Sequence, residues 1–142
     1  MIRAALQGRG KRRAANAPPP PAETRLLPHS RPNAGVRLTV DGRTLAYTGD
    51  TGPSPEVVTL ARDADLLLAE ASYVDQVPPG LAGTLTSARD AGRQAAEAGA
   101  QQLILTHMMP GTSAEEARKA AARGYDGPIE VATAGLVSDL SG

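Results

Sequence analysis

Several residue types that usually build cores and reactive sites are missing from this sequence. None of the 142 residues is cysteine, phenylalanine or tryptophan, and only three are tyrosine. The lack of cysteine excludes disulfides, thiolate zinc sites and cysteine nucleophiles, and a core must be filled by alanine, leucine and valine, which bury little area each. No apolar run approaches the ~20 residues that span a bilayer, and no apolar segment follows the basic N-terminus as in a secretory signal. We therefore expect a cytoplasmic protein without a membrane segment.

Charge is balanced over the whole chain but not along it. Fifteen basic and fifteen acidic residues cancel to a net charge of zero, which does not favour a nucleic-acid partner. Residues 1–28 nevertheless hold six basic residues against one acid, Glu23, together with the four prolines Pro18 to Pro21. This composition predicts a disordered arm, followed by a folded domain over residues 29–142. The arm could bind nucleic acid, but it lacks interleaved aromatic residues for base stacking.

Strand and helix patterns alternate from Gly35 onward. Apolar and polar residues alternate on both sides of Asp41-Gly42, which predicts a hairpin over 36–47. Serines with the spacing of helix caps precede three amphipathic segments. The pattern predicts helices over 55–62, 87–98 and 113–123, and strands over 65–70, 103–106, 129–131 and 136–140. An α/β fold follows.

Few residues have side chains that could carry chemistry. The two histidines are His29 and His107; His107 directly follows an apolar strand, and Asp50 lies in a Gly-Asp-Thr-Gly loop just after another. Sites in α/β sheets usually form at the carboxyl ends of strands, so Asp50 and His107 could converge on a metal ion. A surface or hydrogen-bonding role for His107 stays open. Glu70, at the end of a strand, could hydrogen-bond a ligand or could face solvent.

Three stretches of the sequence resemble one known family. They are Leu-Ala-Tyr-Thr-Gly-Asp-Thr-Gly-Pro-Ser-Pro at 45–55, Ala-Asp-Leu-Leu-Leu-Ala-Glu-Ala-Ser-Tyr at 64–73, and Leu-Ile-Leu-Thr-His at 103–107. Together they look like the metallo-β-lactamase superfamily, and most like its ribonuclease Z-like branch, over residues 26–140. The resemblance implies the C-terminal half of an αββα sandwich, with one mixed sheet covered by helices on one side.

The resemblance also implies roles for three residues. Asp50 matches the catalytic carboxylate that bridges two metal ions, and His107 matches a terminal ligand of one of them. His29, followed by Gly35-Val36-Arg37, partly matches the family's ligand to the other ion. The implied metal is zinc, in two ions, and the implied reaction is hydrolysis of an ester, lactam or phosphodiester by metal-bound hydroxide. The substrate itself is not indicated.

The sequence departs from the family pattern in two places. The N-terminal His-x-His-x-Asp-His motif is absent, and Thr84 stands where the family often has a histidine before the long helix. We therefore expect a truncated chain that is inactive, or nearly so, by itself, and the sequence does not show whether Met1 is its true start. One alternative is a non-catalytic interaction module that uses an exposed sheet face to form a homo-oligomer or to bind a missing N-terminal half. Another is an RNA-binding accessory that acts through the basic arm.

Overall fold

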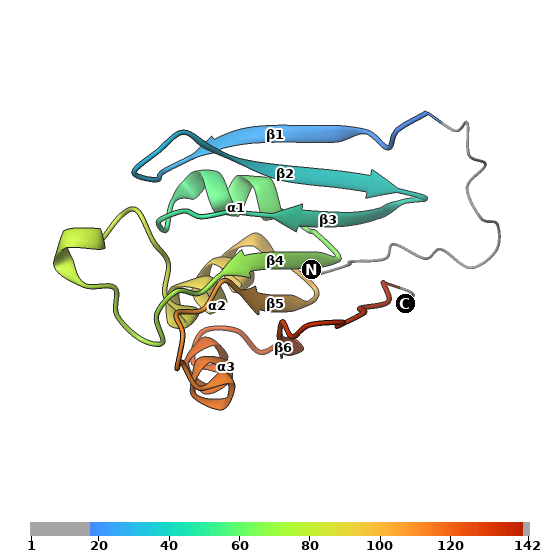
Figure 1. The fold of residues 1–142 in the computed structure, drawn as a ribbon. Helices are drawn as coiled ribbons and strands as arrows, with labels where there is room; N and C mark the ends of the chain where they lie inside the picture. Colours follow the sequence, from blue (N-terminus) through green and yellow to red (C-terminus); the bar gives the residue numbers. More distant parts are fainter. Residues whose placement is uncertain (1–17, 141–142) are drawn as a thin grey trace.

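A mixed sheet forms the centre of the computed structural model, which describes residues 18–140 (Figure 1). Its six strands lie side by side in the order in which they occur in the sequence. The first two pairs are antiparallel, and every pair from β3 onward is parallel. The strands are β1 (Ala22–Leu27), β2 (Asn33–Val40), β3 (Arg43–Tyr47), β4 (Leu66–Glu70), β5 (Leu103–Thr106) and β6 (Ile129–Val131). The predicted α/β class and mixed sheet are confirmed.

The predicted hairpin joins β2 to β3. Val40 pairs with Arg43, and the two residues between them, Asp41 and Gly42, have φ angles of 49° and 76°. Two consecutive positive φ angles are what a two-residue hairpin turn requires, and Asp-Gly adopts them at low cost. The local sequence therefore fixes the register of this pair.

Serine caps start the three helices of the described residues. Ser54, Ser87 and Ser113 each accept a hydrogen bond from the backbone amide three residues ahead, which satisfies one amide at the start of each helix. The helices are α1 (Pro55–Ala61), α2 (Ala88–Ala98) and α3 (Ala114–Ala122), and a 3-10 turn, η1 (Pro79–Leu81), precedes α2. No helix within residues 18–140 is long and apolar enough to cross a membrane.

All three helices cover one face of the sheet (Figure 1). Alternate residues of β4 show the division, because Leu67 and Ala69 pack toward the helices while Leu66 and Leu68 belong to the opposite cluster. The helices contribute mainly alanines to the core, so they approach closely. A Cβ added at Gly92 of α2 would fall within 3.0 Å of the backbone of α3.

The C-terminal segment covers part of the helix-free face. Leu136 and Leu140 pack against the cluster of Leu45, Leu66, Leu68 and Ile104. The strand predicted over 136–140 is wrong, because the chain turns after β6, where the amide of Leu136 donates to the carbonyl of Thr133 (3.1 Å). Nearer β1 the same face is open, and Leu26 is 76% exposed. Tyr47 of β3 and Val137 of the C-terminal segment are exposed as well, so the C-terminal segment covers the expected exposed apolar face only in part.

Strand β1 contradicts part of the prediction that residues 1–28 form a disordered arm. Residues 22–27 were expected to be disordered, but they pair with β2 along their whole length. Leu27 is buried in the core beside Leu60, and Arg25 forms an ion pair with Glu56 (2.6 Å). The predicted boundary at residue 28 is therefore too late, and residues 1–17 of the predicted arm lie outside the described residues.

Candidate metal centre

Three side chains of metal-ligand type meet at the carboxyl ends of β3, β4 and β5. Asp50 follows β3, Glu70 is the last residue of β4, and His107 directly follows β5. Because these strands are parallel neighbours, their carboxyl ends lie at one edge of the sheet, where sites in α/β folds usually form. The predicted convergence of Asp50 and His107 therefore has its structural basis in the strand order.

The three side chains are close enough to share one ion. The Nδ1 atom of His107 lies 2.8 Å from Oδ1 of Asp50 and 3.5 Å from Oε2 of Glu70, and one potential ligand atom from each residue lies within 4.8 Å of the other two. The side chains of His107 and Asp50 are 56% and 43% exposed, whereas that of Glu70 is 1% exposed. The site therefore opens to solvent beside Asp50 and His107.

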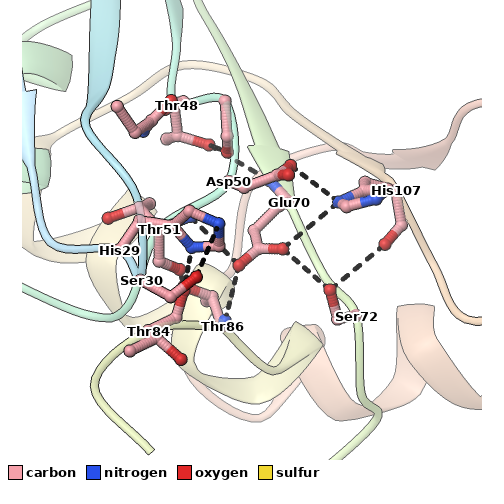
Figure 2. A network of polar contacts seen from close by, with 12 residues as sticks. His29, Ser30, Thr48, Asp50, Thr51, Glu70, Ser72, Thr84, Thr86 and His107 are labelled. Carbon is pink, nitrogen blue, oxygen red and sulfur yellow. Dashed lines mark hydrogen bonds and ion pairs between the residues drawn. The ribbon is translucent and has the colours of Figure 1, made fainter. Parts of the chain in front are cut away.

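The backbone of His107 has an uncommon conformation. Its φ angle is 53°, in the left-handed region that few residues other than glycine adopt. Backbone strain of this kind is found most often at functional sites. Here the turn directs the imidazole toward Asp50 and Glu70 (Figure 2).

Glu70 is a buried carboxylate with several hydrogen-bond donors around it. Its Oε1 accepts from the backbone amides of Thr51 (3.2 Å) and Thr86 (2.8 Å), and its Oε2 accepts from the hydroxyl of Ser72 (2.8 Å). Burial raises the pKa of Glu70 and the nearby negative charge of Asp50 adds to this, while the three hydrogen bonds act in the opposite direction. From the sequence, Glu70 was expected either to hydrogen-bond a ligand or to face solvent, and its burial excludes the second role.

The loop that carries Asp50 is attached to β4. The amide of Thr48 donates to the carbonyl of Leu68 (3.1 Å), and the hydroxyl of Thr48 accepts from the amide of Glu70 (3.2 Å). Gly49, with a φ angle of 61°, turns the chain so that Asp50 projects from the sheet edge. The pKa of Tyr47 is raised by the partial burial of its side chain and then by the negative charges of Asp50 and Glu70.

A second loop, just before α2, packs against the Asp50 loop. The hydroxyl of Thr86 donates to the carbonyl of Thr51 (2.6 Å), and Gly52 lies directly against the backbone of Gly83. The hydroxyl of Thr84 donates to the carbonyl of Leu81 (2.8 Å) and so closes the turn of η1. Thr84 therefore uses its side chain within its own loop.

His29 lies outside the group formed by Asp50, Glu70 and His107. Figure 2 shows it next to Ser30 and Thr84 and away from His107, and its Nδ1 lies 2.7 Å from the carbonyl oxygen of Thr84. Because a carbonyl only accepts, this contact places the imidazole proton on Nδ1 and leaves the lone pair on Nε2. Metal-binding histidines commonly have such a backbone partner, so His29 stays a predicted ligand.

The donor set suits a metal ion such as zinc. Imidazole nitrogen and carboxylate oxygen are the ligands that Zn²⁺ takes in cysteine-free sites. Ligands of a tetrahedral zinc ion with bonds of about 2.1 Å lie roughly 3.4 Å apart, close to the separations of His107 Nδ1 from Asp50 and Glu70 (2.8 and 3.5 Å). The residues present therefore fit a metal.

Comparison with known proteins identifies relatives of this sequence. The sequence model of the Beta-lactamase superfamily domain matches residues 9–108. An uncharacterised protein of Mycobacterium leprae is 40% identical over 119 residues, which cover 82% of this chain and 41% of that protein. A protein named ribonuclease Z in Myxococcus xanthus is 41% identical over 102 residues, covering 70% of this chain and 33% of that protein. The chain thus spans about two fifths or less of the length of these relatives.

A solved structure has the same arrangement of strands and helices. The crystal structure of the metallo-beta-lactamase fold protein YhfI from Bacillus subtilis superimposes with a TM-score of 0.78 at 28% sequence identity. The match covers 85% of this chain and 50% of that chain. The family-model match over residues 9–108 includes Asp50, Glu70 and His107, and the similarity in fold supports the same family.

Proposed function

This chain belongs to the metallo-β-lactamase superfamily of hydrolases, and from that premise we propose that Asp50 and His107 bind zinc in a hydrolytic centre. The observation that carries the proposal is the approach of His107 Nδ1 to Asp50 Oδ1 at the open edge of the sheet (2.8 Å). A metal ion bound at this point would take the place of the proton that a contact of this length between the two atoms requires. The proposed substrate is an ester, a lactam or a phosphodiester.

The three predicted ligands, Asp50, His107 and His29, would have different roles in this centre. When bound, zinc supplies a Lewis acid that lowers the pKa of a coordinated water toward neutrality. Asp50, which is half exposed at the open edge, would help to hold both ions of the proposed pair, and His107 would bind one of them. His29 would offer Nε2 to the other, because the Thr84 carbonyl holds its Nδ1 proton.

Proton transfer to the leaving group needs a donor other than Thr84. The Thr84 hydroxyl is engaged with the Leu81 carbonyl, and a hydroxyl is a far weaker acid than an imidazolium at neutral pH. This favours substrates whose leaving group needs little protonation. One relative is named ribonuclease Z, which keeps a phosphodiester among the proposed substrates.

Further ligands are needed to hold two zinc ions tightly, since each takes three or four protein ligands. We propose that they come from a further polypeptide segment or from a second copy of the chain. The open face beside Leu26 is the surface against which such a segment would pack. A cytoplasmic location is proposed as well, and cell fractionation would test it.

The RNA-accessory alternative gains no support from the described residues. Part of the predicted basic arm is strand β1, and Arg25 is paired with Glu56. The exposed face near Leu26 is compatible with an interaction module, but the family membership and the cluster of three metal-ligand side chains favour a hydrolytic centre.

Zinc binding to the 142-residue chain tests the proposed function. Calorimetric titration of the wild type should show binding, and Asp50→Asn and His107→Ala should each weaken it at least tenfold, because each removes a ligand. Asp41→Asn is the matched control, since Asp41 is an exposed turn residue outside the site. Hydrolysis of a chromogenic phosphodiester with and without zinc measures activity. Unchanged zinc affinity in both site variants would refute the proposal.

A further inference from the structure

One buried carboxylate contacts the Asp50 loop and the segments that lie against His29 and His107. Glu70 is 1% exposed, although it ends a strand at the edge of the sheet. Its hydrogen-bond partners come from the Asp50 loop, from the loop before α2 and from the residues after β4 (Figure 2). The burial of a charged group is costly unless donors surround it, so this arrangement needs a physical reason.

The first connection leads to Asp50. Oε1 of Glu70 accepts from the amide of Thr51 (3.2 Å), and Thr51 is the residue directly after Asp50. Since a buried amide without an acceptor is destabilising, the loop is held where this amide points at Glu70. The backbone position of Asp50 is therefore set by the reach of the Glu70 side chain.

The second connection leads to His29. The same Oε1 accepts from the amide of Thr86 (2.8 Å), and the Thr86 hydroxyl donates back to the carbonyl of Thr51 (2.6 Å). Two residues earlier in the same loop, the carbonyl of Thr84 holds His29. One oxygen atom thus joins the two loops that face each other across the site.

The third connection leads to His107. Oε2 of Glu70 lies 3.5 Å from His107 Nδ1 and accepts from the Ser72 hydroxyl (2.8 Å), which itself lies 3.4 Å from the carbonyl of His107. His107 is held in a left-handed backbone conformation, so contacts on both its ring and its carbonyl limit how it can relax.

We infer that Glu70 is a positioning residue, which sets the spacing of the metal-binding side chains through the Thr51 and Thr86 amides. The inference rests on the proposed function and deepens it. Three donors already bind the Glu70 carboxylate, two amides at Oε1 and the Ser72 hydroxyl at Oε2. In this respect Glu70 differs from Asp50. A carboxylate in direct contact with the ion would instead act mainly through its charge.

Two single substitutions distinguish the effect of the length of the Glu70 side chain from the effect of its charge. Glu70→Gln keeps the length of the side chain and a carbonyl oxygen for the two amides but removes the charge. Glu70→Asp keeps the charge but withdraws the oxygens by about 1.5 Å, one C–C bond. Both replacements are polar and no larger than glutamate, so both suit a site that already has donors for them.

Amide hydrogen exchange of the zinc-free chain measures the anchoring directly. In Glu70→Asp, the Thr51 and Thr86 amides should exchange at least tenfold faster than in the wild type, whereas in Glu70→Gln they should stay within about threefold. Zinc affinity, measured by calorimetry, should follow the same order. Glu70→Asp should bind zinc about 10–100-fold more weakly than the wild type, as is usual when a residue that supports a ligand is altered. The loss of zinc affinity in Glu70→Gln should be smaller.

Asp65→Asn is the matched control. Asp65 lies beside the other end of β4, where it likewise accepts hydrogen bonds from a backbone amide, that of Thr44 (2.7 Å), and from Arg43 (2.9 Å). Its substitution should lower stability without changing the zinc affinity, which separates positioning from a general loss of stability.

Two results would overturn the inference. One is unchanged exchange of the Thr51 and Thr86 amides in Glu70→Asp. The other is a larger loss of zinc affinity in Glu70→Gln than in Glu70→Asp, which would make Glu70 a direct ligand. If the wild type binds no zinc at all, the proposed function fails, while the exchange experiment still decides whether Glu70 anchors the two loops.

Discussion

Replacement of Gly52 by alanine should separate the two loops of the site. Gly52 has an ordinary φ angle, so the backbone itself tolerates alanine, but the added Cβ would lie within 3.0 Å of three backbone atoms of Gly83. Ordinary contacts of a Cβ begin at 3.4 Å, and both partners are backbone, so no side chain can rotate away. The loops must move apart by about 1 Å, an overpacking that typically costs about 1–3 kcal/mol.

The same movement should weaken the hydrogen bonds between the loops. The bond from Thr86 to the Thr51 carbonyl is 2.6 Å long and that from the Thr51 amide to Glu70 is 3.2 Å, and 1 Å added to either takes it beyond a useful hydrogen bond. The loss of one such bond adds about 1 kcal/mol. We expect the free energy of unfolding to fall by about 2–4 kcal/mol, and Tm by roughly 8–15 °C.

Urea denaturation followed by far-ultraviolet circular dichroism measures this change. Gly80→Ala is the control, because no atom lies within 4 Å of the Cβ that it adds and its φ angle is not in the left-handed region; it should stay within about 0.5 kcal/mol of the wild type. If Gly52→Ala were as stable as Gly80→Ala, the close contact between the loops would not exist in solution.

Three further substitutions test other parts of the structure. Burial alone would raise the pKa of Asp65, but hydrogen bonds from the Thr44 amide and from Arg43 lower it overall, below its ordinary value of 3.8. The wild type should therefore lose stability as the pH falls from about 4 through the folded-state pKa, and urea titrations between pH 2 and 7 should show that Asp65→Asn lacks this part of the acid dependence. Ser87→Ala should cost about 1 kcal/mol in thermal denaturation, because the Ser87 hydroxyl accepts from the amide at the start of α2; a neutral result would mean that water replaces the cap. Leu105→Ala should cost about 2–5 kcal/mol, since Leu105 is fully buried, whereas Leu26→Ala, at a mostly exposed position, should cost far less.

Those parts of the fold that follow from local rules were predictable from the sequence. Ser54 with Pro55, and Ser87 three residues before Asp90, are local signals for the start of a helix, and the structure places α1 and α2 there. The Asp41-Gly42 turn is equally local. The meeting of Asp50 and His107 was predictable as well, because it requires only that both follow parallel strands of one sheet, whose carboxyl ends lie at the same edge.

The parts that depend on distant partners were not predictable. Strand β1 lies in a segment rich in proline and arginine, and it is stabilised by pairing with β2 and by burial of Leu27 against α1. The role of Glu70 depends on Thr51 and Thr86, which lie 19 and 16 residues away in sequence. No spacing rule connects such residues, because loop packing brings them together.

The strand order has a consequence for how the chain folds. Every strand pairs with its neighbours in sequence, so the sheet can grow by one strand at a time without threading, and each step closes only one loop. The longest of these loops, residues 71–102, lies between β4 and β5, and its closure has the largest entropy cost in the series. Asp50 and Glu70 follow β3 and β4, and His107 follows β5, so the pairing of β4 with β5, which closes the longest of these loops, is also the pairing that brings the three side chains of the candidate metal centre together.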